Sequence, residues 1–257
     1  MKFKAILLTA TSVILIAMAG CSDIDNGNKI EKEYNEDTII NVAIKYNVLG
    51  ETHILDDEYN NIKIEYPVII GLSDENMQKT INEIIMVEAL NVYNYYDYED
   101  RGHLELDVTF NIALEDESVL SIQYYGLGYV ENAAHPNKLF YTTNIDMLTG
   151  VKMRLANLLD IEDDFVSMFI GGEFNHVGPL GEEPDLGYYG SHDMAKEGLI
   201  SADNEGSIFS YLTNDSIGIS IPVSHAIGGF ALFEIDYDDI REYVIEDNQG
   251  WNIFINN

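Results

Sequence analysis

Two stretches decide the fold of this chain: SDENMQKTINEIIMVEALNVYNYY at residues 73–96 and LELDVTFNI at residues 104–112. The second stretch alternates apolar and polar residues, which is typical of a strand with one buried face and one face in water. The first predicts a long amphipathic helix that packs on that strand's sheet, with Ser73 as N-cap and two acids in the first turn. Its apolar stripe consists of Met77, Ile81, Ile84, Ile85, Ala89, Val92 and Tyr96.

Strands are expected on both sides of this pair. Alternating apolar residues predict one strand over 40–46, and a second one over 62–66. Pro67 has no N–H to donate, so it should stop the second strand or confine it to a sheet edge. Antiparallel strands are expected over 119–125 and 139–145, followed by a turn at 149–150.

The remainder of the chain mixes short helices and strands. The pattern predicts one or two short helices over 155–169, a Gly- and acid-rich excursion over 171–206 with a helix near 194–200, and a short helix over 237–243. Strands are expected at 208–212, 217–223, 230–235 and 251–255. This order lacks a regular βαβ alternation, so the predicted class is α+β, with two small subdomains of antiparallel sheet, each packed against one or two helices.

The first twenty residues have the features of an export signal. Lys2 and Lys4 precede an apolar run that is too short to span a bilayer comfortably, and Met-Ala-Gly-Cys follows at 18–21. Small residues before the chain's single Cys resemble a bacterial lipobox, in which Cys21 is lipidated and becomes the mature N-terminus. The alternatives are an ordinary signal peptide, or an uncleaved anchor with an incidental Cys.

This interpretation divides the chain into four parts. Residues 1–20 are the signal peptide, 21–37 a flexible polar tether, 38–146 an N-terminal subdomain and 147–257 a C-terminal subdomain. The protein is then expected on the extracytoplasmic face of the cell membrane, held there by its lipid.

Charge excludes one class of partner. The 257 residues include 45 Asp and Glu against 13 Lys and Arg, a formal net charge of −32, and such a chain repels the nucleic-acid backbone. The acidity has two interpretations. It is either an adaptation of the whole surface to salt or high pH, or a surface that attracts a basic partner.

The sequence contains no common catalytic motif. It has no GxSxG, GxGxxG, Walker, HExxH or CxxC motif, and no two of its six His are spaced i, i+3 or i+4. Acidic clusters at 97–100, 160–164 and 236–239 could supply paired carboxylates or a Ca²⁺ site, but none has the Gly of an EF-hand loop. We therefore expect no catalytic residue, no metal site and no cofactor.

Several short segments resemble a paired module of extracytoplasmic bacterial proteins. That module is similar to the outer part of the lysozyme-sensing anti-sigma-V factors and to the region before the catalytic domain of peptidoglycan deacetylase C. The resemblance implies that 38–146 is deacetylase C N-terminal-like and that 147–257 is anti-sigma-V C-terminal-like. The segments are IEYPVI at 64–69, QKTIN at 78–82, LSIQYY at 120–125, AHP at 134–136, NIDMLTG at 144–150, FSYLTND at 209–215 and AIGG at 226–229.

The resemblance implies two α+β subdomains and, in the anti-sigma-V case, binding of lysozyme, a basic protein. The chain lacks the segments that the family uses to bind sigma factor, to span the membrane and to deacetylate glycan, so we expect a non-enzymatic binding module. Its expected ligand is a basic extracellular protein such as lysozyme or a cell-wall glycan, with His135 and His225 as candidate contacts. The alternatives are a peptidoglycan or glycan hydrolase that uses two facing carboxylates, and an acidic lipoprotein that binds Ca²⁺.

Overall fold

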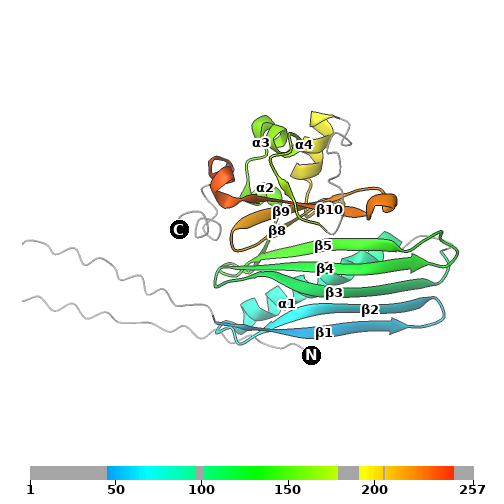
Figure 1. Cartoon of the computed structure of the whole chain (residues 1–257). Coiled ribbons are helices and arrows are strands. Elements are labelled where there is room, and N and C mark those ends of the chain that lie inside the picture. Colours follow the sequence, from blue (N-terminus) through cyan, green and yellow to red (C-terminus); the bar gives the residue numbers. More distant parts are fainter. Residues whose placement is uncertain (1–44, 97–100, 179–190, 205, 246–257) are drawn as a thin grey trace, which may run out of the picture. The chain divides into compact units, whose positions relative to one another are not determined.

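Two β-sheets and the helices that cover them make up the fold (Figure 1). A computed structural model describes residues 45–96, 101–178, 191–204 and 206–245, and all of these belong to one compact unit, Val42–Asn257. One sheet has six strands in the order β1-β2-β3-β4-β5-β6, and the other has four in the order β7-β10-β9-β8. The predicted α+β class is confirmed. The division of the chain at 146/147 stays a prediction.

The six-stranded sheet follows the order of the chain, and every pair of neighbours is antiparallel except β2 and β3. Parallel neighbours need a crossover connection, and here the chain crosses through α1 (Glu75–Leu90) and the 3₁₀ helix η1 (Asn91–Tyr96). A single βαβ unit is therefore embedded in an otherwise antiparallel sheet. The strands are β1 Asn47–Asp56, β2 Asn60–Ile70, β3 Leu104–Glu115, β4 Val119–Val130, β5 Asn137–Asp146 and β6 Val151–Met153.

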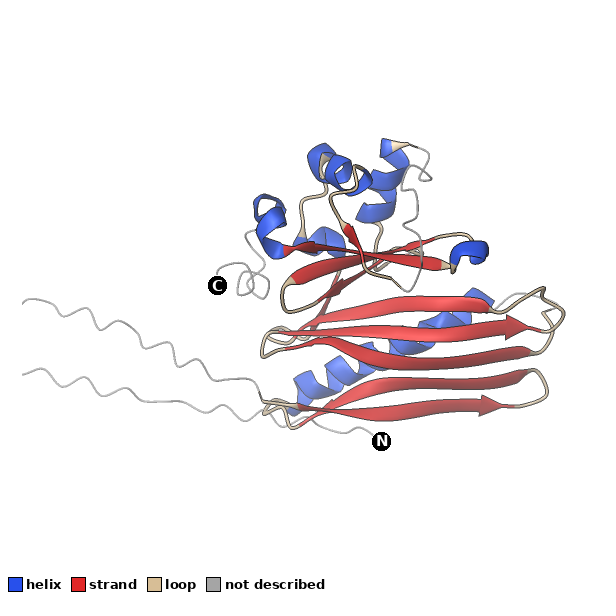
Figure 2. Cartoon of the chain, viewed as in Figure 1, coloured by secondary structure: helices blue, strands red, loops and turns tan. Residues whose placement is uncertain are grey.

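Helix α1 lies along one face of this sheet (Figure 2). Its N-cap is Asp74, one residue after the predicted Ser73, and the Asp74 carboxylate accepts hydrogen bonds from the backbone N–H groups of Asn76 and Met77. The predicted apolar stripe faces the sheet: Met77 and Ile84 are half-buried, and the others are at most 5% exposed. These are Ile81, Ile85, Ala89, Val92 and Tyr96.

Strand β2 does not stop at Pro67, contrary to one of the two expectations, but continues to Ile70. β3 pairs with β2 only from Asn60 to Ile64. At Pro67 the strand is paired only with β1, opposite Gly50. Proline occupies the half of β2 that is locally an edge, where a missing N–H costs no ladder bond.

The four-stranded sheet and its helices account for most of the elements predicted downstream. β7 was not predicted, because two residues carry no periodic signal. The expected strands at 40–46 and 251–255 lie wholly or largely outside the described residues. The strands are β7 Asn175–His176, β8 Phe209–Leu212, β9 Ser216–Pro222 and β10 Phe230–Asp236, and the helices are α2 Leu155–Leu158, α3 Asp163–Ile170, α4 His192–Ile200, η3 His225–Ile227 and η4 Tyr237–Tyr243.

A buried polar seam joins the two sheets. In β5, Tyr141 donates its hydroxyl to the carbonyl of Ala89 in α1, so its neighbour Thr142 points to the opposite face. There Thr142 Oγ1 donates to the carbonyl oxygen of Ser210 in β8 at 2.6 Å, and Asn144 Nδ2 donates to the same oxygen at 2.9 Å. The second sheet thus covers β5 and the Ser121 end of β4 on this face, and it leaves the part over β2 and over Glu105 and Asp107 of β3 open.

Candidate functional site

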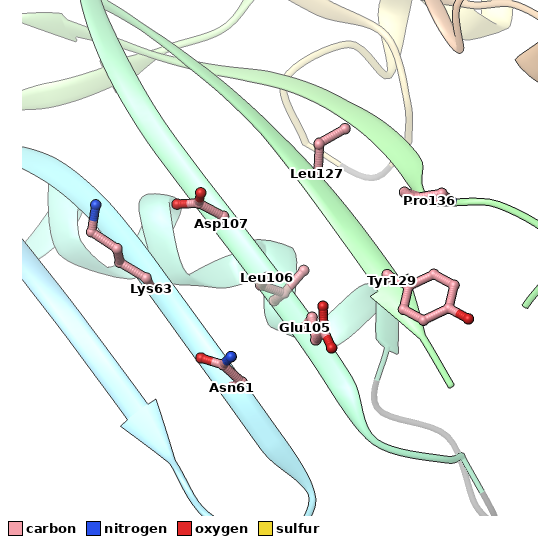
Figure 3. A pocket seen from close by; sticks show the side chains of 8 residues that line it. All are labelled: Asn61, Lys63, Glu105, Leu106, Asp107, Leu127, Tyr129 and Pro136. Carbon is pink, nitrogen blue, oxygen red and sulfur yellow. The ribbon is translucent and has the colours of Figure 1, made fainter. Parts of the chain in front are cut away.

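The open part of the first sheet carries polar side chains from three neighbouring strands. Ile62 and Ile64 of β2 are buried in the core beneath α1, so Asn61 and Lys63 lie on the opposite face. The same alternation in β3 places Glu105 and Asp107 beside them, and Figure 3 shows these side chains across adjacent strands. A hollow of about 530 Å³ lies over them. It is lined by Asn61, Lys63, Glu105, Leu106, Asp107, Leu127, Tyr129 and Pro136.

A second hollow, of about 500 Å³, continues the first toward the four-stranded sheet. The two share Lys63, Asp107 and Leu127, so we treat them as one open-face groove. Phe230 of β10 borders the groove, and its ring stacks on Phe140 of β5 with the ring centres 5.1 Å apart. The second hollow is lined by Lys63, Asp107, Thr109, Tyr125, Gly126, Leu127, Lys138, Leu139 and Phe230.

Charges in the groove are only partly balanced. Lys63 forms an ion pair with Glu65, and this contact lowers the pKa of Glu65 and raises that of Lys63. Thr109 also donates to Glu65, at 3.1 Å. Glu105 and Asp107, in contrast, form no ion pair within the described ranges, and both are exposed. The groove therefore offers two carboxylates to a ligand.

Aromatic and aliphatic surface lies next to these carboxylates. Leu127 is 51% exposed, which is unusual for a leucine in the middle of a sheet. Tyr125 and Tyr129 flank Leu127 on the same strand, and the ring of Tyr125 packs edge-on against Phe140. Carboxylates beside rings can bind an ammonium or guanidinium group, or a sugar with its hydroxyls and apolar face. Either ligand class fits this groove.

The two histidines predicted as ligand contacts come together at one end of the groove. His135 is in the β4–β5 loop next to Pro136, and His225 is in the β9–β10 loop. Both are exposed, and their ring centres are 4.7 Å apart with 54° between the ring planes. His135 Nδ1 lies 3.4 Å from the Pro136 carbonyl oxygen, directly before β5. The sequence pointed to each histidine separately and gave no sign that they meet.

A serine and a histidine also meet, but not as a catalytic pair. His192 Nε2 is 3.3 Å from Ser167 Oγ and 3.1 Å from the backbone carbonyl oxygen of Asp163. A carbonyl oxygen only accepts, so Nε2 carries the proton and donates it there. In the tautomer that donates to Asp163, Nε2 cannot accept the proton of Ser167, so this arrangement is not that of a nucleophile and its base.

The predicted lipidation site Cys21, the signal peptide and the tether all lie outside the described residues. Of the helices that are described, none is long and apolar enough to cross a membrane. Within the same ranges, no group of three or more His, Cys, Asp or Glu side chains is placed to hold a metal ion.

Comparisons with known proteins give a fold and no activity. No family model matches the sequence, and no curated protein matches it. A DUF3298 family protein from Bacteroides fragilis matches in structure with a TM-score of 0.51 and 12% identity, over 80% of this chain and 95% of its own. Another, from Pseudomonas aeruginosa, gives a TM-score of 0.47 and 12% identity over 79% and 95%.

Both neighbours belong to DUF3298. At 12% identity the Bacteroides protein shows a shared fold and nothing more. This agrees with the expected domain of unknown function. The narrower resemblance to anti-sigma-V factors and deacetylase C stays an expectation.

Sequence reasoning missed most of the groove. A usable signal was present, because Glu105 and Asp107 occupy the polar positions of the strictly alternating stretch 104–112. It predicted a wet face without indicating that Tyr129, Lys138 and Phe230, from three other strands, would border it. Adjacency of this kind depends on strand order, which alternation does not encode.

Proposed function

We propose that this chain is a lipid-anchored binding module on the extracytoplasmic face of the bacterial cell membrane. It captures a basic protein such as lysozyme, or a cell-wall component, in the open-face groove, and it breaks no covalent bond. The observation that carries the proposal is the pair of exposed carboxylates, Glu105 and Asp107, beside the ring of Tyr129; among the described residues neither forms an ion pair. The lipid on Cys21 supplies the membrane attachment.

A basic protein is the ligand that the electrostatics favour. A formal charge of −32 accelerates its approach at low salt, and the groove then supplies a specific contact. One lysine or arginine side chain of the partner pairs with Glu105 or Asp107 and lies against the Tyr129 ring. The resemblance to lysozyme-sensing anti-sigma-V factors supports the same class of partner.

A cell-wall glycan is the second ligand in this proposal. Sugar hydroxyls would bond to Asn61, Asp107 and Glu105, and a sugar ring would pack on Tyr129 or Leu127. Lys63 and Lys138 would pair with the carboxylates of wall peptides. This ligand uses the same groove, so one set of variants tests both.

One observation favours an enzymatic alternative. Glu105 and Asp107 are successive residues on one face of β3, and such residues lie about 6.6 Å apart, within the roughly 5–9.5 Å that separates glycosidase carboxylates. Both side chains are exposed, however, and neither is enclosed by apolar side chains as the general acid of a glycosidase is. Binding is therefore the better proposal. The protein should release no fragments from peptidoglycan; a release that Glu105→Gln abolishes would favour the hydrolase.

Binding of residues 22–257 to lysozyme across a salt series tests the proposal. The double variant Glu105→Gln/Asp107→Asn should bind at least about tenfold more weakly, because it removes both carboxylates with which the partner's cation can pair. A matched double variant on α4, Asp193→Asn/Glu197→Gln, removes the same charge away from the groove and should bind almost normally. A basic protein of similar charge is the ligand control, and wall fragments are tested with the same proteins.

Two results would count against the proposal. The first is that both double variants weaken binding equally and that all binding is lost by about 0.15 M salt. Binding would then come from the overall negative charge of the protein and not from the groove. Absence of binding to lysozyme and to wall fragments alike would remove the proposed ligands.

A further inference from the structure

The contact between His135 and His225 is independent of the groove carboxylates. Each ring is exposed and comes from a loop outside the main cores, and the two loops belong to different sheets. The β4–β5 loop extends the six-stranded sheet, and the β9–β10 loop extends the four-stranded one. The two imidazoles therefore lie where the sheets meet at the groove rim.

Backbone hydrogen bonds close both loops that carry the histidines. The β9–β10 loop is closed by hydrogen bonds from Val223 N to Gly229 O at 3.0 Å and from Gly229 N to Ser224 O at 3.3 Å. Gly229 adopts a φ of +88°, which allows this closure without strain. In the other loop, Ala133 N donates to Val130 O at 2.9 Å. Two imidazoles on closed loops are partly preorganised as a pair of ligands.

The separation of the rings fits a shared metal ion. An ion bound at about 2.0–2.1 Å from an imidazole nitrogen lies roughly 3.2 Å from the ring centre, so two ligands at about 90–110° have centres roughly 4.5–5.2 Å apart. The observed 4.7 Å falls within this range.

The hydrogen bonding of His135 also suits a ligand. Its Nδ1 is 3.4 Å from the Pro136 carbonyl oxygen, which can only accept; in the tautomer with the proton on Nδ1, the lone pair of Nε2 is available to a metal. A ring N–H that bonds to a backbone carbonyl is the usual support of a metal-binding histidine.

We propose that His135 and His225 together chelate one divalent transition-metal ion at the groove rim. The described residues supply no third protein ligand, so water completes the coordination. Imidazole ligands favour Cu²⁺, followed by Ni²⁺ and Zn²⁺. The ion joins the two loops, and through them the two sheets.

Titration of the full chain with Ni²⁺ and with Zn²⁺, followed by calorimetry, tests this site. All proteins carry Cys21→Ser, because the chain's only thiol would itself bind metal. His135→Ala and His225→Ala should each weaken the tightest site by at least about tenfold, since a single imidazole does not chelate. The double variant His135→Ala/His225→Ala should bind the metal about as weakly as either single variant, because losing one imidazole already destroys the chelate. Ni²⁺ should also raise the melting temperature of the parent and of neither single variant.

His103→Ala is the matched control. His103 is exposed and its Nδ1 also lies near a backbone carbonyl oxygen, that of Glu58 at 3.2 Å, but the structure gives its ring no contact with another described histidine. It should bind Ni²⁺ like the parent. Circular dichroism in the presence of a chelator first shows that His135→Ala and His225→Ala are folded. The proposal fails if these folded variants also bind Ni²⁺ like the parent, since the two rings then only stack. It fails equally if His103→Ala loses the same site. Neither result depends on lysozyme or glycan binding.

Discussion

Asp203 and Ser210 are joined by two buried hydrogen bonds: Ser210 N donates to Oδ1 at 2.7 Å, and Ser210 Oγ donates to Oδ2 at 2.6 Å. Oδ2 also accepts from the backbone N–H of Leu155 at 2.9 Å. Asp203 is 3% exposed and has a φ of +64°, so one carboxylate fixes the turn after α4, the start of α2 and strand β8. Because Ser210 in turn accepts bonds from β5, Asp203 supports the seam between the sheets.

Replacing Asp203 should destabilise the fold. Asp203→Asn turns an NH₂ group toward a buried donor, and the lost bond should reduce the free energy of unfolding by about 1–3 kcal/mol. Urea unfolding followed by circular dichroism measures this. Glu197→Gln on α4, an exposed site, should change the free energy by less than about 0.5 kcal/mol. Equal effects of the two would show that the buried bonds contribute nothing.

Asp203 should also give a pH-dependent difference. Burial raises its pKa, against the opposing effect of the hydrogen bonds from Ser210 and Leu155. A raised folded pKa means that the protonated form is favoured by folding, so the contribution is present at low pH and is lost as the pH rises through the folded pKa. The stability difference between wild type and Asp203→Asn should therefore shrink as the pH rises above about 4, the ordinary pKa of an aspartate. A difference that grows over this range would contradict the raised pKa.

Gly128 of β4 should not tolerate a side chain. A Cβ there would lie 2.1 Å from the hydroxyl oxygen of Tyr96 and 2.6 Å from Tyr96 Cζ. Gly128→Ala should cost about 1–3 kcal/mol by overpacking, and less in a Tyr96→Ala background, where the clash is gone. Gly50→Ala in β1 is the control, since its Cβ would meet Phe110 at an ordinary 3.6 Å. Additive costs in the double variant would mean that Tyr96 is not the obstacle.

A charge in the stripe of α1 should unfold the protein. Ile85 is fully buried, whereas Val87, on the same helix, is 61% exposed. Ile85→Asp should cost several kcal/mol, since a buried carboxylate without a partner is strongly unfavourable. Val87→Asp should melt within a few degrees of wild type. A normal melt for Ile85→Asp would refute the packing of α1.

Local pattern predicted α1 and strands β2 to β5 of the first sheet, because their periodicity reports directly which side is buried. Strand β1, Asn47–Asp56, was not predicted: the expected strand at 40–46 ends just before it. The N-cap shifted from Ser73 to Asp74 because both residues can cap and the chain's path from β2 selects between them. Alternation in 62–66 and 104–112 could not show that these strands pair in parallel, since pairing direction leaves no mark on burial. β7 has only two residues and no period.

The candidate site was less predictable than the fold. The polar positions of β3 were visible in the sequence, but the groove depends on β4, β5 and β10 lying beside them. His135 and His225 meet because two loops from different sheets converge. Such contacts arise from tertiary packing, which a pattern within one segment does not specify.

The position of β1 has a mechanical consequence. It is the first described strand, it lies at the sheet edge, and it pairs only with β2, from Asn47 opposite Ile70 to Asp56 opposite Asn61. A force on the preceding chain therefore acts first on Asn47, and it breaks the hydrogen-bonded pairs between β1 and β2 one after another from that end. The groove over β3 and β4 can keep its shape while β1 separates from β2.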